Sequence, residues 1–385
     1  MEILVAPNAF KNSLDATKVA EAIAKGFRRS KLSCRCTVFP VGDGGDGTGD
    51  LLIRRLKGKI VSSDVHDAMG RPVTASFGMI AEDHLAVIEM ANASGLKLLD
   101  KNVIAPMLAN SYGTGLQILE SLNRGARKII IALGGSATTD GATGILRALG
   151  VKFLDKDGNI LHHLPRDLKF LDRIDITGID HRILNSEIIV LCDVENTLLG
   201  SNGAAKIFAA QKGATPDEIN QLEKALAVLA KKIYELNGRD VINIKHGGAA
   251  GGTAAGLYGL LRAKLLNGIE HFLDITGFND QLAATDMVIT GEGSIDEQTL
   301  HGKGPFGVAA RAKQFGLPVI GLAGKLPSRP VQQLDRYFTE LISINPGNTS
   351  DEQAIANTKM NLEKTAYNLG NRLVRKDNSH KFLKE

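Results

Sequence analysis

The sequence predicts an α/β protein of two domains, in which an open parallel-sheet domain is interrupted by an inserted domain with a mixed sheet. Three observations predict it: the chain length, short apolar strands alternating with helical patterns near both ends, and two consecutive alternating strands in the middle. At 385 residues the chain exceeds one typical domain. The simplest division places residues 1–65 and 283–385 in the first domain and residues 66–282 in the second.

Short apolar runs followed by helical patterns support the parallel-sheet domain. Residues 3–6 form the first expected strand, and residues 16–28 follow as an amphipathic helix with Asp15 as its N-cap. Parallel strands need such crossover helices between them. Further buried strands are expected at residues 36–41, 287–290, 319–322 and 341–344.

The middle of the chain follows a different pattern. Residues 73–79 and 85–90 are consecutive strands with alternating faces, which predicts a mixed or antiparallel portion of sheet. Further buried strands are expected at residues 129–133 and 188–192.

The clearest helix of the sequence begins at Pro216. Thr215 precedes it as the expected N-cap, and Glu218 stands where it completes a capping box. An apolar stripe from Ile219 to Ile233 follows helical spacing. We therefore expect an amphipathic helix here.

The composition limits the classes of function. Apolar residues make up 43% of the chain and charged residues 23%, as in a globular protein with large cores. The net charge is +4, and no basic stripe interleaves with aromatic residues, so we expect no nucleic-acid partner. No apolar run approaches the roughly 18 residues that span a bilayer, so we expect no membrane association.

The cysteines and the first residues predict a cytoplasmic protein. Cys34, Cys36 and Cys192 are too few for a disulfide framework and lack the spacing of a zinc site, so we expect reduced thiols. The chain enters an apolar strand directly, without the basic region and the long apolar region of a signal peptide.

Five loops share one design, in which an apolar strand is followed by glycines mixed with small hydroxyls and carboxylates. Ligands of open α/β sheets bind beyond the carboxyl ends of the strands, where such loops lie. The first loop, residues 7–13, contains Lys11 and Ser13, a cation and a hydroxyl able to hold an anionic substrate or a phosphate. A solvated lysine is the alternative interpretation of Lys11.

The second loop, residues 42–48, matches the dinucleotide fingerprint GxGxxG, and Asp64 lies at a suitable distance for a ribose contact. Asp43 and Asp46 argue against this interpretation, because they place two negative charges where a pyrophosphate would lie. Paired carboxylates flanked by glycines better suit a metal ion or the hydroxyls of a polyol. A tight turn with solvated aspartates is the third interpretation.

The third loop, residues 134–141, is the best candidate for a phosphate site. It follows a buried strand and precedes a helical segment, so N–H groups at a helix N-terminus and three hydroxyls would form an anion cradle. A glycine turn with an Asp or Thr cap is the alternative. The candidate cofactor-binding residues are Gly134, Gly135, Ser136, Thr138 and Asp140.

Carboxylates follow two further strands. Asp193 ends one of them, where an aspartate can act as a general base or a metal ligand. Glu292 and Asp296 follow the other, with Lys303 close behind. A sixth glycine-rich segment, residues 247–252, either binds a phosphate or allows close packing of a helix.

Several familiar catalytic motifs do not occur in the sequence. It contains no Walker A motif, no protein-kinase motif set, no HExxH and no GxSxG. Its nine histidines are scattered, which argues against a histidine-based metal centre or triad. Three classes of function stay open on the residues alone: a phosphotransferase, a dinucleotide-dependent oxidoreductase that uses residues 42–48 with Asp64, and a non-catalytic protein that binds a sugar acid.

Taken together, these loops resemble the bacterial-type glycerate kinase family (glycerate 2-kinase, class I). The resemblance covers essentially the whole chain, and nine motifs occur in the right order. They are AFKNSL (9–14), PVGDGGDGT (40–48), IEMANASGL (88–96), YGTG (112–115), LGGSATTDGATG (133–144), CDVENTLLG (192–200), QKGA (211–214), GGAAGG (247–252) and TGEGSIDEQTLHGK (290–303).

The resemblance implies a fold, an activity and a set of partners. The fold is a flavodoxin-like α/β domain interrupted by a second α/β domain. The activity is transfer of the γ-phosphoryl group of ATP to D-glycerate, generally yielding 2-phosphoglycerate. The small-molecule substrate is then the expected partner, and a homo-oligomer is left open.

Phosphoryl transfer needs positioning and charge neutralisation more than covalent chemistry, and the loops are assigned on that basis. ATP phosphates are expected on residues 134–141. Lys11 and Lys303 are expected to stabilise the transferring group or hold the glycerate carboxylate. Mg²⁺ is expected on carboxylates among Asp193, Glu292 and Asp296, and the general base is Asp193 or Asp296. Ser13, Asp43 and Asp46 are expected to bind the substrate, with a second metal as the alternative for the two aspartates.

The chain departs from the family pattern at a few positions. The family usually has Asn-Asp-Gly-Gly at residues 139–142, Asn-Pro at residues 196–197 and Phe-Gly-Pro-Gln-Lys-Gly at residues 208–213. Asp46 stands where the usual residue is Glu. We expect Thr197 and Ala210 to change backbone geometry, and substrate affinity to be affected more than activity.

Overall fold

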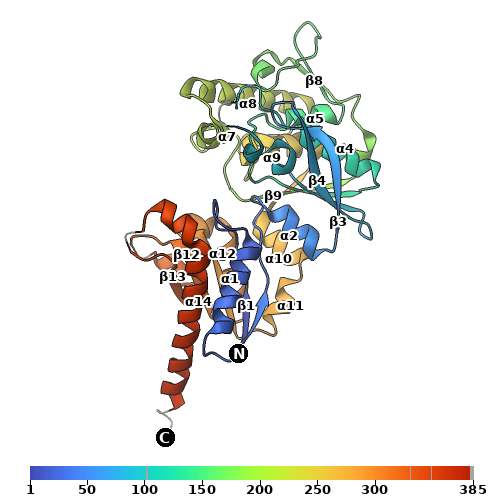
Figure 1. The fold of residues 1–385 in the computed structure, drawn as a ribbon. Helices are drawn as coiled ribbons and strands as arrows, with labels where there is room; N and C mark the ends of the chain where they lie inside the picture. The colour runs from blue at the N-terminus through green and yellow to red at the C-terminus, as the bar shows by residue number, and fades with distance from the viewer. Residues whose placement is uncertain (101–102, 330, 348, 382–385) are drawn as a thin grey trace. The chain divides into compact units, whose positions relative to one another are not determined.

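The computed structural model describes residues 1–100, 103–329, 331–347 and 349–381. The chain forms two compact units, Met1–Asp43 with Ile269–Glu385 and Gly44–Gly268. The blue start and the red end of the chain therefore belong to the same unit (Figure 1). These unit limits differ from the boundaries expected near residues 65 and 282, and the division into domains stays a prediction.

The first unit is built on a five-stranded sheet in which every pair of neighbouring strands is parallel. Numbered along this unit alone, its strands have the spatial order 2-1-3-4-5, which is the flavodoxin order. Its apolar core lies between this sheet, the first helix and the last helix. The strands are β1 (Glu2–Val5), β2 (Arg35–Val38), β11 (Met287–Ser294), β12 (Val319–Lys325) and β13 (Glu340–Ser343).

Helix α1 (Ala16–Arg29) of this unit begins as expected, because the Asp15 side chain accepts a hydrogen bond from the Lys18 N–H at 2.9 Å. It lies against helix α14 (Asp351–Lys381), as Figure 1 shows. Gly26 permits the close approach, since a Cβ there would overlap the Glu363 carbonyl. The other helices are α10 (Gly268–Ile275), α11 (Phe278–Leu282), η4 (Glu297–His301), α12 (Gly304–Gln314) and α13 (Gln332–Asp335).

The second unit is built on a six-stranded mixed sheet of order β10-β9-β6-β5-β4-β3. The β3–β4 and β4–β5 pairs are antiparallel, and the remaining three pairs are parallel. A separate antiparallel pair, β7 with β8, completes the strands. Their bounds are β3 (Lys59–His66), β4 (Pro72–Ile80), β5 (Leu85–Glu89), β6 (Lys128–Ala132), β7 (Lys152–Leu154), β8 (Arg173–Asp175), β9 (Glu187–Cys192) and β10 (Lys264–Asn267).

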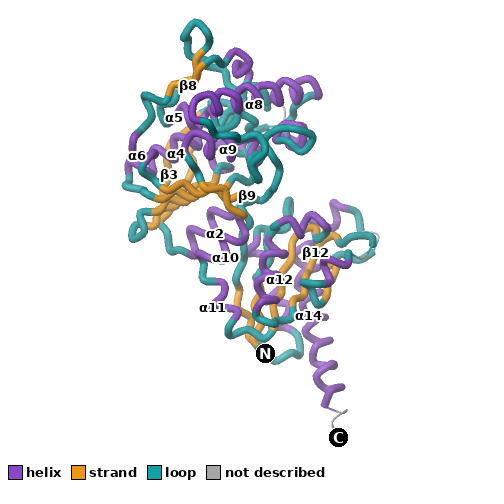
Figure 2. The backbone as a smooth tube through the Cα atoms, turned by 180° about the vertical axis from the view of Figure 1, so that it is seen from behind, coloured by secondary structure: helices purple, strands orange, loops and turns teal. Residues whose placement is uncertain are grey.

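Helices cover both faces of this mixed sheet. Figure 2 shows α2 on one face and α4, α8 and α9 on the opposite face. The main apolar core joins β6 and β9 to α5, α8 and α9. The helices are α2 (Thr48–Arg55), α3 (Ala91–Ser94), η1 (Leu96–Leu98), α4 (Tyr112–Asn123), α5 (Thr143–Ala148), η2 (Arg166–Phe170), α6 (His181–Leu184), α7 (Ala204–Phe208), η3 (Ala210–Lys212), α8 (Pro216–Asn237) and α9 (Ala249–Leu261).

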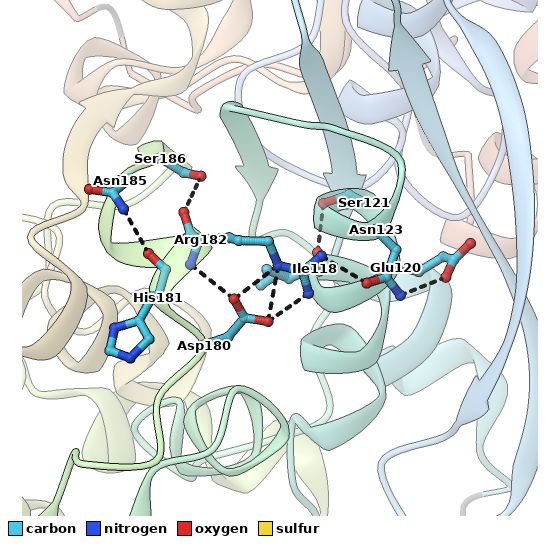
Figure 3. Close-up of polar contacts among 9 residues, drawn as sticks. All are labelled: Ile118, Glu120, Ser121, Asn123, Asp180, His181, Arg182, Asn185 and Ser186. Atoms are coloured by element: carbon cyan, nitrogen blue, oxygen red, sulfur yellow. Dashed lines mark hydrogen bonds and ion pairs between the residues drawn. The ribbon is translucent and has the colours of Figure 1, made fainter.

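A polar network ties the segment that enters β9 to the end of α4 (Figure 3). The Arg182 guanidinium pairs with Asp180 at 2.6 Å and donates to the Asn123 amide oxygen at 3.0 Å. Ser186 donates its hydroxyl to the Arg182 carbonyl at 2.8 Å. The network fixes where β9 begins, and β9 leads directly to the loop that carries Asp193.

The structure confirms the predicted fold class, with one all-parallel sheet and one mixed sheet. The expected strand at residues 36–41 ends earlier, at Val38. Strands β3, β7, β8 and β10 were not expected from the sequence. Among the described residues, no helix is both long and apolar enough to cross a membrane.

The capping box of α8 gives a test of the local sequence rules. Thr215 accepts from the Glu218 N–H at 3.3 Å, and Glu218 accepts from the Thr215 N–H at 2.9 Å. Thr215→Ala removes the hydroxyl that accepts from the Glu218 N–H and should lower the free energy of unfolding by about 1 kcal/mol. Thr215→Ser keeps the hydroxyl and should stay close to wild type. Urea denaturation of both variants measures the difference, and equal losses would contradict the capping role.

Candidate active site

In the first unit, two carboxylates lie near each other at the carboxyl ends of parallel strands. Asp43 follows β2 and is buried, and its Oδ2 accepts from the Asn8 amide at 2.8 Å and from the Gly304 N–H at 3.3 Å. Gly304 is the first residue of α12, so Asp43 faces the positive end of an 11-residue helix. This contact explains how the protein tolerates a buried aspartate here.

Glu292 is the second carboxylate of this group, and it lies on β11 with 8% of its surface exposed. The Thr299 hydroxyl donates to its Oε1 at 3.0 Å. Burial raises the pKa of Glu292 to about 7; the charge of Lys303 opposes this shift, and the charge of Asp43 adds to it. The charge of Lys11 also reaches Glu292. Asp43, Glu292, Lys11 and Lys303 therefore form one electrostatic group, which we call the carboxylate–lysine cluster.

Asp296 and Ser13, also predicted for the site, make local structural contacts. The Asp296 carboxylate caps η4, accepting from the Gln298 N–H at 2.9 Å and from the Ser294 hydroxyl at 3.2 Å. The Ser13 hydroxyl donates to the Ile355 carbonyl of α14 at 2.8 Å. Asp296 also borders an open cavity of about 570 Å³ between η4 and residues 327–329 and 331.

In the second unit, two glycine-rich loops pack backbone against backbone. The Gly134 N–H donates to the Gly44 carbonyl at 3.0 Å. A Cβ at Gly134 would overlap the backbone of Gly45 and Asp46, so only glycine fits there. The Asp46 side chain pairs with Lys97 at 2.8 Å. Asp46 and the predicted phosphate loop are thus neighbours.

Glu89 is a buried carboxylate of this region that the sequence analysis did not single out. It ends β5 and accepts from the Gly47 N–H at 2.7 Å and the Gly49 N–H at 3.0 Å. Burial raises the pKa of Glu89 to about 7, and the hydrogen bond and charge of Asp46 add to the shift. Glu89 therefore anchors the start of α2 from beneath.

Asp140, a predicted cofactor-binding residue, is fully buried and caps α5 from inside the protein. Its Oδ2 accepts from the Ser111 N–H at 2.9 Å, the Ser111 hydroxyl at 2.8 Å and the Gly144 N–H at 2.9 Å. Ile145 donates its N–H to the Ser111 hydroxyl at 3.1 Å. These N–H groups at the start of α5 are therefore engaged by protein atoms, which leaves residues 134–138 as the candidate anion cradle.

Lys212 belongs to the same loop system and was not anticipated as a site residue. Its ammonium donates to the Ser136 hydroxyl at 3.2 Å and to the Thr138 carbonyl at 2.5 Å. Burial lowers the pKa of Lys212 to about 8, and the charge of Asp140 opposes that shift. The sequence signal was weak, because a single lysine after a short helix is usually solvated.

Asp193 follows β9 and is half buried, and the residues after it are held by the start of α9. His246 binds the Val194 carbonyl through Nδ1 at 2.6 Å, which requires the proton on Nδ1, and Gly248 donates to the Asn196 carbonyl at 2.8 Å. The glycine-rich segment 247–252 also packs on the phosphate loop, since a Cβ at Gly251 would overlap the Thr138 carbonyl. Close packing is the role that these contacts support.

The three predicted metal ligands divide between the units, with Asp193 in the second and Glu292 and Asp296 in the first. Within the described ranges, no three His, Cys, Asp or Glu side chains converge as a metal centre. Mg²⁺ at phosphoryl-transfer sites takes one or two protein carboxylates and fills the remaining positions with phosphate oxygens and water. Buried Glu292, with Asp43 beside it, fits that donor chemistry.

The dinucleotide-binding alternative does not fit the topology. A dinucleotide fingerprint requires a βαβ unit whose two strands are parallel neighbours. Here the strand after α2 is β3, which pairs antiparallel with β4 in the six-stranded sheet, whereas β2 belongs to the five-stranded sheet. Asp64 lies within β3 and accepts from the Thr74 hydroxyl at 2.9 Å.

Comparison with known proteins gives concordant matches. A model described as the glycerate kinase family matches residues 3–374. A glycerate 2-kinase of Escherichia coli K12 is 43% identical over 348 residues, covering 89% of this chain and 91% of that protein. A glycerate kinase of Halalkalibacterium halodurans is 40% identical over 367 residues, covering 95% and 97% respectively. The crystal structure of a Salmonella typhimurium LT2 protein assigned as glycerate kinase 2 aligns with a TM-score of 0.83 at 39% identity, covering 98% of this chain and 99% of that one.

Glu89 predicts a measurable pH dependence of stability. Its folded pKa of about 7 lies above the ordinary value, so its contribution to stability is complete below about pH 4.5 and is lost as the pH rises through 7. The loss amounts to at most about 3 kcal/mol. Glu89→Gln does not titrate and should lose less stability than wild type between pH 5 and pH 8, as measured by denaturation at each pH. The exposed Glu82→Gln is the control, and an unchanged pH slope in Glu89→Gln would contradict the assignment.

Proposed function

The chain belongs to the glycerate kinase family, and we propose that it transfers the γ-phosphoryl group of ATP to D-glycerate, giving 2-phosphoglycerate and ADP. The observation that carries the proposal is the match of the family model to nearly the whole chain. The similarity to a glycerate 2-kinase over 89% of the chain supports the 2-position.

We assign D-glycerate to the carboxylate–lysine cluster. Lys11 and Lys303 supply positive charge for the substrate carboxylate or the transferring phosphoryl group. Asp43 and Glu292 accept hydrogen bonds from substrate hydroxyls, and burial raises the pKa of Glu292 to about 7. Ser13 and Asp46 remain predicted contacts of the substrate.

The nucleotide phosphates are assigned to Gly134, Gly135, Ser136 and Thr138. Gly135 has a φ of 72°, a conformation that glycine adopts without strain. Asp140 supports this loop as the buried cap of α5, and we place it among the nucleotide-site residues in that supporting role. Mg²⁺ is assigned to Glu292 and would neutralise charge on the phosphates when it is bound, and Asp193 stays a predicted metal ligand.

Asp193 is our choice for the general base that accepts the proton of the substrate hydroxyl. Asp296, the other predicted base, has both carboxylate oxygens engaged: Oδ1 caps η4, and Oδ2 accepts from the Ser294 hydroxyl. Asp193 follows the carboxyl end of β9, and ligands of such sheets bind at strand ends, which supports Asp193 as the base. We propose a cytoplasmic location for the enzyme, in line with its three free cysteines.

Purified protein with ATP, Mg²⁺ and D-glycerate should release ADP only when glycerate is present. EDTA should abolish the release, because phosphoryl transfer needs the metal to neutralise phosphate charge. A coupled assay follows ADP, and phosphorus NMR identifies the product. Saturable binding of D-glycerate without ATP turnover would instead support a non-catalytic binding protein, and turnover with another hydroxy acid would change the substrate.

Two matched substitutions test the choice of base. Asp193→Asn removes the proton acceptor and should lower kcat by about 10²–10⁴-fold with little change in stability. Asp296→Asn should mainly lower the melting temperature, because the cap of η4 is weakened. Steady-state kinetics with thermal denaturation measures both. Normal kcat in Asp193→Asn would reject this base, and normal kcat in both variants would reject the pair.

A further inference from the structure

Lys212 is exceptional among the basic residues of this protein. Within the described part of the chain, it is the one lysine or arginine whose side chain is buried, with 2% of its surface exposed. It ends η3 and is followed by Gly213 in the left-handed conformation, with a φ of 89°. The chain thereby turns away after Lys212, whose side chain points into the interior.

The Lys212 ammonium makes two hydrogen bonds to the short segment of residues 136–138. It donates to the Ser136 hydroxyl at 3.2 Å and to the Thr138 carbonyl at 2.5 Å, on either side of Ala137. An ammonium has three donors, so these bonds use two of them. Both acceptors are neutral, and the one charge that acts on Lys212 belongs to Asp140.

The same loop contains an unusual concentration of unsatisfied polar atoms. Thr138 Oγ1, Thr139 Oγ1, Asp140 Oδ1 and Thr143 Oγ1 are buried and find no hydrogen-bond partner among the described residues. More than nine in ten buried polar groups in proteins are paired, so four exceptions within six residues require an explanation. Polar groups left in this way are typically completed by buried water or by an ion.

A buried ammonium is energetically unfavourable for a structural role alone. Removing an ammonium from water costs several kcal/mol, and an apolar side chain of similar volume is often at least as stable in such a place. Perturbed, buried charges therefore concentrate at functional sites. In a site that excludes water and whose groups are already fixed, a positive charge attracts an anion far more strongly than it would in water.

Resting on the function proposed above, we propose that Lys212 is a positioning residue of the nucleotide site. Its hydrogen bonds fix the position of the segment 136–138, and its positive charge favours binding of the nucleotide phosphates to this segment. Lys212 takes no direct part in the phosphoryl-transfer step. Loss of its charge should thus weaken the nucleotide and spare the acceptor substrate.

Lys212→Met tests this inference, because methionine fills similar space without charge. We expect the KM for ATP to rise about tenfold or more, as for loss of one charge-assisted interaction, while the KM for D-glycerate stays within about twofold. The matched control is Lys206→Met, which removes an exposed lysine of α7 that binds Asn220 at 2.6 Å. The control should leave both constants unchanged.

Equal increases in both KM values, or a lower melting temperature with unchanged KM values, would overturn the inference and leave Lys212 a structural residue. Absence of glycerate-dependent ATP turnover in the wild-type protein would instead reject the proposed function. The two failures are therefore distinguishable.

A second measurement uses the wild-type protein and requires no variant. In protein labelled with ¹⁵N at lysine Nζ, the buried ammonium of Lys212 should titrate well below the surface lysines. Binding of ADP should raise its titration midpoint, since a charge that favours the phosphates is favoured by them in return. Adenosine, which lacks phosphates, should leave the midpoint unchanged. An ADP complex with an unshifted midpoint would contradict the inference.

Discussion

The close backbone packing around residues 134–141 is the constraint on which the proposed nucleotide site depends. Gly134 lies against Gly45 and Asp46, and Gly251 lies against the Thr138 carbonyl. Gly256 of α9 lies as closely against the Gly141 carbonyl. No side chain fits at these contacts, so the glycines determine where the loop sits relative to α9 and to the loop after β2.

In both units, the protein buries charged groups in settings that disfavour their charge. Glu89, Glu292 and Lys212 all have pKa values shifted toward neutrality by burial. Each also makes hydrogen bonds that fix its position. Such groups stabilise a fold poorly, yet they are suited to bind and orient charged ligands. Their location at strand ends and glycine loops agrees with the proposed kinase function.

The elements whose signals are local could be predicted from the sequence. Asp15 and Thr215 cap their helices as expected, because capping depends on residues within one turn. Strand β3 was not anticipated, since most of its residues are exposed or half buried, and Ile60 is 67% exposed. It is a strand because it pairs along its whole length with β4, a tertiary effect that no local pattern reveals.

The site residues show the same division between local and tertiary signals. Strand-end loops drew attention to Asp43 and Glu292, which share one electrostatic group, and their roles in the site stay predictions. The internal contacts of Asp140 depend on Ser111, 29 positions away, and those of Lys212 on residues more than 70 positions away. Sequence spacing could not show these partners. For the same reason, the sequence could not show that Asp296, a predicted base and metal ligand, caps η4.

We propose that residues 136–138 bind the nucleotide phosphates and that the carboxylate–lysine cluster binds the acceptor substrate, D-glycerate. A crystal structure with Mg²⁺, a non-hydrolysable ATP analogue and D-glycerate tests it most directly. We expect phosphate oxygens against Ser136 and Thr138, and D-glycerate in contact with Lys303 and Glu292. Phosphates bound instead in the cavity bordered by Asp296, with none in contact with residues 136–138, would contradict the proposal.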